Sequence, residues 1–206
     1  MKFISAVLAV TIIACSAPTS FAQETSPPGM VEIEMLRDVV LGNPDAPVTI
    51  EEFASMTCVH CAAFSTDVFP ELKTRYIDTG KVRFVLKPFP LDSVSAGAFM
   101  LARCGSDDEF YARVEHLFAT QKDWLVSDNT GDALLQSMSA FGMDQNTFQQ
   151  CLTNKEALNW VMTTKEAAIE VVTGTPTFII NGIVSKGNMP IERFADIIEP
   201  LLDEAE

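Results

Sequence analysis

The sequence predicts an α/β fold in which a sheet-forming domain is interrupted by an inserted helical domain. Three observations carry this prediction: a strand–helix–strand order early in the chain, a middle region with helical periodicity and almost no strand signal, and a hairpin followed by a helix near the C-terminus. We expect the sheet domain to comprise residues 41–91 and 173–206, and the inserted helical domain to comprise residues 92–172.

The N-terminus has the pattern of an export signal. Lys2 precedes an apolar stretch of about a dozen residues, too short to span a bilayer, and a small-x-small motif ends at Ala22. We expect residues 1–22 to be a signal peptide cleaved near Ala22, residues 23–40 to be a Pro-rich tether, and the protein to reside in the periplasm. Two alternatives stay open: lipidation at Cys15, which follows a lipobox-like Ile-Ile-Ala, and an apolar helix of the fold itself.

The composition limits the class of partner. The 206 residues suit one domain or a domain with an insertion, and the 48% apolar content is enough for a core. With a net charge of −14, the chain lacks the cluster of Lys and Arg side chains that binding to a polyanion requires. We therefore expect no nucleic acid and no anionic membrane surface as partner.

The first part of the sheet domain contains two predicted strands joined by a helix. Residues 41–47 carry turn-forming Pro and Asn-Pro, and residues 48–53 are β-branched and aromatic. Residues 62–79 repeat apolar side chains at helical spacing, with Gly80 as a C-cap, and residues 81–87 form a second strand. The helix makes a crossover long enough for parallel pairing of the two strands.

The middle and the end of the chain supply the remaining elements. Asp144 is a candidate helix N-cap, and an Ala-rich helix is predicted over residues 156–172. Residues 177–184 predict a hairpin, because Asn-Gly between β-rich runs favours a type I′ turn. Residues 191–202 form a terminal amphipathic helix.

Two cysteines lie at the junction between the first predicted strand and the helix that follows it. The spacing of Cys58 and Cys61 places both side chains on one helix face, within reach of a disulfide. At a helix N-terminus, free backbone N–H groups and the positive dipole end stabilise a Cys58 thiolate, and His60 adds to that effect. We predict Cys58 as the attacking sulfur and Cys61 as the buried resolving one.

Other interpretations of this motif remain. A purely structural disulfide over so small a loop would contribute little constraint. A metal site would use both cysteines and His60, yet no fourth ligand is evident, since His116 is the only other histidine. We expect no metal.

Residues 52–61 (Glu-Phe-Ala-Ser-Met-Thr-Cys-Val-His-Cys) resemble the active-site segment of DsbA-like periplasmic oxidoreductases of the alphaproteobacterial type. The C-x-H-C form is the hallmark of this family, and Val59 stands where its best-known members have Pro. Residues 174–178 (Gly-Thr-Pro-Thr-Phe) match a second signature, a cis-proline loop facing the disulfide. The resemblance runs from about residue 40 to the C-terminus and implies a thioredoxin fold with an inserted helical domain.

The resemblance also implies roles for further residues. A cis Thr175–Pro176 bond would leave the Thr175 backbone free to pair with a substrate strand, with its side chain near the sulfurs. Glu52 resembles the buried acid of this fold, a proton acceptor for Cys61, and Lys87 is its candidate partner. The alternatives are an ordinary strand carboxylate and a solvated surface lysine.

Cys104 and Cys151 form a second, distant pair. Removal of the leader takes Cys15 with it and leaves an even number of cysteines in an exported chain, and some similar proteins carry an additional disulfide in the helical domain. We expect a structural disulfide closing a loop of about 47 residues, worth on the order of 4 kcal/mol. The alternative is two reduced, buried cysteines.

These features predict a dithiol oxidase. Its Cys58–Cys61 disulfide would oxidise unfolded or reduced exported proteins without another cofactor, and a DsbB-like membrane partner would reoxidise it. An isomerase or reductase on the same fold is one alternative, although residues 23–40 are too short for a substantial dimerisation region, which favours a monomer. A non-enzymatic metal chaperone, with Met56 or Met189 as added ligands, is the other.

Overall fold

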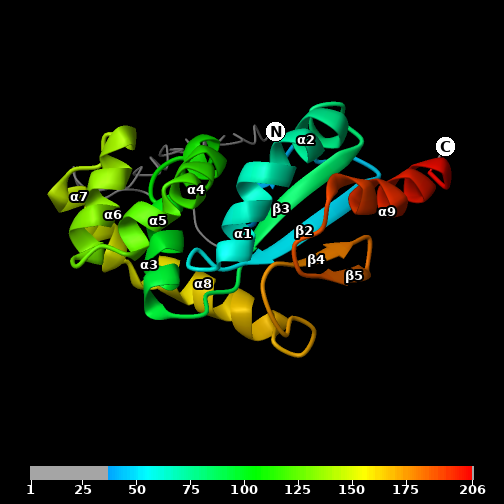
Figure 1. Cartoon of the computed structure of the whole chain (residues 1–206). Coiled ribbons are helices and arrows are strands. Elements are labelled where there is room, and N and C mark those ends of the chain that lie inside the picture. The colour runs from blue at the N-terminus through cyan, green and yellow to red at the C-terminus, as the bar shows by residue number, and fades with distance from the viewer. Residues whose placement is uncertain (1–36, 206) are drawn as a thin grey trace, which may run out of the picture. The chain divides into compact units, whose positions relative to one another are not determined.

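The computed structural model describes residues 37–205, and Figure 1 shows how they are arranged. The predicted signal peptide, Cys15 and most of the predicted tether lie outside the described residues. Within the described residues, no helix is long and apolar enough to cross a membrane.

A mixed five-stranded sheet forms the centre of the described part of the chain, in the order β1-β3-β2-β4-β5. The strands are β1 (Val40–Leu41), β2 (Val48–Ala54), β3 (Val82–Pro88), β4 (Thr177–Ile180) and β5 (Ile183–Lys186). β2 and β3 pair in parallel, from Val48 opposite Val82 to Ala54 opposite Pro88, and the other neighbours pair antiparallel. The predicted parallel crossover is confirmed.

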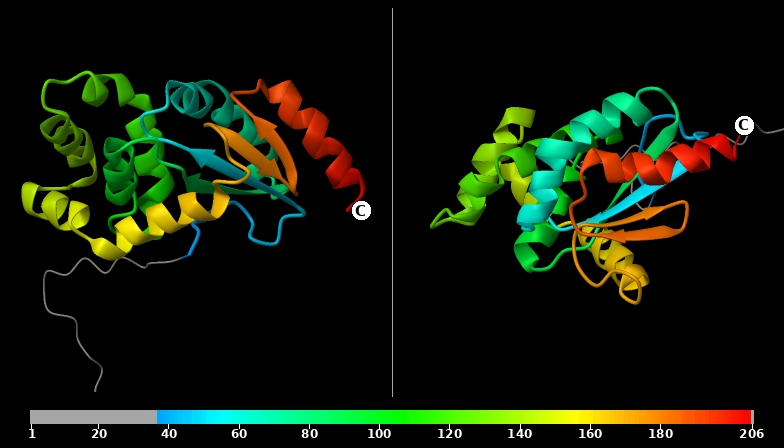
Figure 2. Two further views of the ribbon diagram at one scale, coloured as in Figure 1. Left: turned by 90° about the horizontal axis from the view of Figure 1, so that it is seen from below. Right: turned by 45° about the vertical axis from the view of Figure 1, so that its right-hand side comes forward.

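The two faces of β2 pack against different layers of helices. Val48, Ile50 and Ala54 face the main core beneath the helix that follows β2 and the C-terminal helix α9 (Ile191–Asp203). Phe53 faces the other side, where it packs with Ala168 and Val172 near the end of α8 (Lys155–Ala168). Figures 1 and 2 show α8 on the opposite side of the sheet from α1 (Val59–Ala63) and α9.

The helix after β2 begins directly after Cys58, as the cysteine spacing predicts. It starts at Val59 and continues through the π-helical turn Phe64–Val68, α2 (Phe69–Leu72) and the π-helical turn Lys73–Ile77. Pro70 interrupts the regular hydrogen-bond ladder, because it has no backbone N–H. Gly80 follows the helix with a φ of 76°, a conformation that favours glycine at a C-terminal cap.

The tether predicted over residues 23–40 is wrong at its C-terminal end. Val40 and Leu41 form β1, which pairs antiparallel with β3. The Tyr111 hydroxyl fixes this edge, since it donates to the Val39 carbonyl at 2.8 Å and accepts the Leu86 N–H at 3.1 Å. A two-residue strand is too short to show the alternation by which strands are detected in a sequence.

The C-terminal hairpin and helix match their predictions. Asn181 and Gly182 both have positive φ, 43° and 88°, as a type I′ turn requires, and they connect β4 to β5. The terminal helix α9 follows directly after Pro190, its N-cap residue.

The inserted helices lie between β3 and β4, as predicted, and share the main core with the sheet. They are α3 (Ser93–Ala102), the 3₁₀ turn Asp107–Glu109, α4 (Phe110–Ala119), α5 (Gln121–Leu125), α6 (Thr130–Met138), the 3₁₀ turn Ser139–Phe141, α7 (Gln145–Leu152) and α8. Asp144 caps α7 by accepting the Thr147 N–H at 2.7 Å. The helix predicted over residues 156–172 ends at Ala168, and a turn leads from it to β4.

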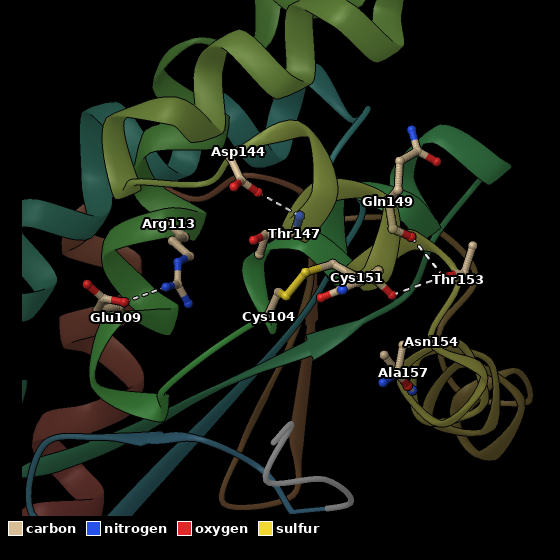
Figure 3. Close-up of a disulfide and its surroundings, with 11 residues drawn as sticks. Cys104, Glu109, Arg113, Asp144, Thr147, Gln149, Cys151, Thr153, Asn154 and Ala157 are labelled. Atoms are coloured by element: carbon tan, nitrogen blue, oxygen red, sulfur yellow. Dashed lines mark hydrogen bonds and ion pairs between the residues drawn. A yellow bond between two sulfur atoms is a disulfide. The ribbon is translucent and has the colours of Figure 1, made fainter. Parts of the chain in front are cut away.

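A disulfide joins Cys104, just after α3, to Cys151 in α7, 47 residues further along the chain (Figure 3). Both cysteines are buried within the helical insertion. The cross-link therefore constrains a long loop that contains α4, α5 and α6, which is the geometry in which loop-closure entropy is largest.

Replacing both of these cysteines (C104A/C151A) is expected to lower the free energy of unfolding by about 2–4 kcal/mol. The double variant avoids leaving one unpaired thiol that could exchange with the active site. Urea unfolding of the two oxidised proteins, compared at the same pH, measures the difference. An unchanged unfolding midpoint would show that the cross-link does not constrain the unfolded chain.

Candidate active site

Cys58 is the N-cap residue of α1, immediately beyond the loop that ends β2. Its backbone is extended, with φ −81° and ψ 117°, and its Sγ accepts the Cys61 N–H at 3.3 Å. Cys58 is 8% exposed, whereas Cys61 is completely buried. Cys58 thus lies at the helix N-terminus with slight access to solvent, whereas Cys61 has none.

The surroundings of Cys58 favour its ionised form. A hydrogen bond from the Cys61 side chain is the largest influence and lowers the pKa of the Cys58 thiol to about 5. Burial acts in the opposite direction, and the Thr175 side chain and the backbone N–H groups of Cys61 and His60 lower the pKa further. Hydrogen bonds to the charged form therefore outweigh the cost of desolvation.

Cys61 has the opposite preference. Burial raises the pKa of its thiol far above the ordinary value, and the neighbouring Cys58 sulfur and Glu52 carboxylate act in the same direction. The two cysteines therefore differ in their preferred form: the site favours the thiolate of Cys58 and the protonated thiol of Cys61.

The second sequence signature lies against Cys58. The Thr175–Pro176 peptide bond is cis, and the Cys58 thiol donates to the Thr175 carbonyl at 3.3 Å. Among residues 37–205, the buried Thr175 hydroxyl has no hydrogen-bond partner while Cys58 is a thiol. A Cys58 thiolate would supply the acceptor that this hydroxyl lacks.

The inserted helices hold the loop that precedes Cys58. Ser95 of α3 accepts the Met56 N–H at 2.8 Å and the Ser55 hydroxyl at 2.9 Å. Gln121 of α5 donates through Nε2 to the carbonyls of Met56 and Cys58, at 2.8 and 3.1 Å. Sequence reasoning missed Ser95 and Gln121, because a polar residue within a helical pattern does not show which segment it will contact.

Glu52 lies on the core-facing side of β2, close to the cysteines. It is 3% exposed, and its Oε1 has no hydrogen-bond partner in the described part of the chain. Burial raises the pKa of this carboxyl well above the ordinary value, and the charge of Cys58 adds to the increase. Burial therefore favours the protonated form of Glu52 near the cysteines.

The predicted partnership of Lys87 with Glu52 is wrong. Lys87 pairs in register with Phe53 of β2, so its side chain lies on the face opposite to Glu52. There it forms ion pairs with Asp38 and with Glu51, the latter at 3.5 Å. Successive residues of a strand point to opposite faces. Because Lys87 lies opposite Phe53 and not opposite Glu52, its side chain is on the other face of the sheet from the buried acid.

The remaining candidates lie near the surface. Val59 and His60 occupy the exposed first turn of α1. His116 of α4 contacts the Ser137 carbonyl at 3.0 Å and the Phe141 ring. Within residues 37–205, no group of three or more His, Cys, Asp or Glu side chains is arranged to hold a metal ion.

A helix-N-terminal dithiol facing a cis-proline loop, on a sheet with a parallel β2–β3 pair, defines a thioredoxin-fold redox protein. The family model described as thioredoxin matches residues 34–200. Among solved structures, the chain resembles alpha-DsbA1 of Wolbachia pipientis, with 31% identity and a TM-score of 0.76 over 82% of this chain and 92% of that one. BdbD of Bacillus subtilis, in its oxidised form, gives 26% identity and a TM-score of 0.72 over 81% and 93%. The chain belongs to the thioredoxin family, among its DsbA-like thiol–disulfide oxidoreductases.

Curated relatives agree with this placement. A Rickettsia conorii protein, named provisionally as a protein-disulfide oxidoreductase, is 33% identical over 170 residues. That match covers 81% of this chain and 61% of the Rickettsia protein, so the chain spans less than two thirds of that relative. Disulfide bond formation protein D of Bacillus subtilis is 28% identical over 178 residues.

Replacing Cys61 with Ala is expected to raise the pKa of Cys58 above its value of about 5, because the largest stabilising hydrogen bond is lost. Cys61→Ser keeps a donor at this position and should shift the pKa less. The ultraviolet absorbance of the thiolate, followed against pH, measures both. A Cys58→Ser variant should show no titration step in this range, and equal pKa values in the two Cys61 variants would contradict the hydrogen-bond explanation.

Proposed function

We propose that this protein is a dithiol oxidase, which accepts two electrons from a substrate dithiol into a Cys58–Cys61 disulfide and needs no other cofactor. The observation that carries the proposal is the opposite preference of the two sulfurs. Cys58 is stabilised as a thiolate with a pKa of about 5, and burial holds Cys61 as a thiol. Such a pair favours the reduced state of the protein, which makes its disulfide a strong oxidant.

The reaction begins when a substrate thiolate attacks the Cys58 Sγ. The Cys58–Cys61 bond breaks, a mixed disulfide forms between Cys58 and the substrate, and Cys61 leaves with the electron pair and takes up a proton. A second substrate thiolate then attacks the substrate sulfur of the mixed disulfide. Cys58 leaves as a stabilised thiolate, and the substrate keeps the new disulfide.

The surface around Cys58 is suited to extended, unfolded chains. Val59 and Leu91 are 60% and 55% exposed, and the Thr175 backbone adjoins the sulfur. Apolar side chains beside an exposed backbone segment favour an unfolded substrate that pairs as an added strand. The proposed substrates are unfolded or reduced exported proteins in the periplasm, the reoxidant is a DsbB-like membrane protein, and the working form is a monomer.

The reduction potential of the Cys58–Cys61 pair tests the direction of electron flow. Equilibration with glutathione, in the C104A/C151A background so that only one pair titrates, should give a potential well above the value of about −270 mV that is typical of thioredoxin. A potential at or below that value would replace the oxidase by a reductase. Oxidation of a reduced two-cysteine peptide should be lost in Cys58→Ser, and activity that survives this change would remove Cys58 from the mechanism.

A further inference from the structure

A small cavity lies under the active-site helix, between β2, β3 and α4. Its polar lining consists of Glu52, Ser65, Tyr111 and Glu115, and its other walls are apolar or aromatic. The cavity measures about 10 Å³, which is close to the space that one water molecule needs. Side chains of β2 and of the insertion helix α4 therefore line the same cavity.

Glu52 forms the inner end of this cavity. Its Oε1 is buried and has no hydrogen-bond partner among the described residues, although buried polar atoms are almost always paired. A water molecule in the cavity would satisfy this oxygen and would also accept or donate a proton. Since Glu52 is 3% exposed, it exchanges protons with the solvent only through a neighbour of this kind.

Glu115 forms the outer end. Glu115 is exposed to solvent, yet its side chain lines the same cavity as Glu52. Partial burial raises the pKa of the Glu115 carboxyl, and Lys73 acts in the opposite direction. Ser65, half-buried in the π-helical turn Phe64–Val68, adds a hydroxyl-bearing side chain to the lining of this cavity.

We propose that Glu115 is a proton-relay residue, which passes protons between the solvent and Glu52 through one water molecule in this cavity. The proposal rests on the proposed dithiol chemistry, because that chemistry protonates and deprotonates Cys61 once in every cycle. None of the roles proposed above for the cysteines or the cis-proline loop requires Glu115, which lies on α4 of the inserted domain.

Each turn of the proposed cycle conserves protons and electrons. When the substrate thiolate breaks the Cys58–Cys61 bond, Cys61 leaves with the electron pair, and Glu52 donates its proton to that sulfur. The resulting Glu52 carboxylate is buried, and it recovers a proton from the solvent through Glu115 and the water. Reoxidation reverses each step, and the electrons move only between disulfides and thiols.

Several titratable groups surround Glu52 and Glu115. Cys58 and Cys61 face Glu52 from α1, Tyr111 and Glu115 from α4, and Lys73 stands beside Glu115. The Tyr111 hydroxyl is fully engaged with backbone groups, and its pKa is raised by burial, so it does not exchange protons near neutral pH.

The test is the rate at which Cys61 displaces glutathione from Cys58, measured by stopped-flow mixing of the reduced protein with saturating oxidised glutathione. Glu115→Gln should slow this step on the order of tenfold, below the effect of removing a direct general acid–base. It should also increase the solvent deuterium isotope effect, and added formate should restore the rate. Glu166→Gln, which removes an exposed carboxylate of α8 far from the cavity, is the matched control and should behave as the wild type.

A second variant tests the cavity itself. Ser65→Val should slow the same step without changing the charge, and formate should not restore the rate, because the added methyl group takes the space of the water. Wild-type kinetics in both variants would overturn the relay, as would a loss of rate in Glu115→Gln that formate leaves unchanged. The reduction potential stays that of the wild type if Glu115 only transfers protons, so failure of the relay is distinguishable from failure of the oxidase.

Discussion

The hydrogen bonds from the Cys61 backbone and side chain to the Cys58 sulfur are the interaction on which the rest of the site depends. They exist only if the chain leaves β2 and enters α1 with Cys58 as the N-cap residue, and three residues are available for that change of direction. Gln121 and Ser95 hold the backbone of this short loop. The inserted domain thus does more than extend the core: it supplies buried polar side chains that fix the N-terminus of the active-site helix, since a shifted loop would turn these N–H groups away from the sulfur.

Side chains alternate between the two faces of β2, so its neighbouring acids Glu51 and Glu52 lie in different environments. Glu52 faces the cysteines in an apolar layer, whereas Glu51 faces Lys87 on the opposite side of the sheet. A lysine beside Glu52 would keep that carboxyl ionised, because an opposite charge favours the charged form. The separation of Glu52 from Lys87 leaves burial as the dominant influence, which raises the pKa of the Glu52 carboxyl and favours its protonated form.

Local signals in the sequence were sufficient for the larger elements and for the chemistry. Strand 48–53 carries β-branched and aromatic residues, Asn181-Gly182 specifies its turn, and two cysteines at a strand–helix junction define a redox site from their spacing. The errors concern contacts made between distant segments. Nothing local distinguishes Val40–Leu41 from a tether until β3 lies beside it, and Ser95 and Gln121 acquire their meaning only when the insertion packs against the loop. The partnership assigned to Lys87 failed because it depended on the register of β3 against β2, which no single strand encodes.

Burying Glu52 lowers the stability of the fold, and a destabilising residue at this position supports a role in the chemistry. An apolar side chain of similar size would fill the same place without burying an oxygen that lacks a partner, a defect typically worth about 1–3 kcal/mol. In the proposed dithiol chemistry the position next to Cys61 would give the defect a use, because a sulfur whose pKa is raised by burial must receive a proton each time its disulfide opens. A protonated Glu52 would deliver that proton without introducing water to the sulfurs. Under this proposal the low pKa of Cys58 and the buried acid complement each other: the first stabilises an anionic sulfur at the helix N-terminus, and the second prevents an anionic sulfur from persisting in the core.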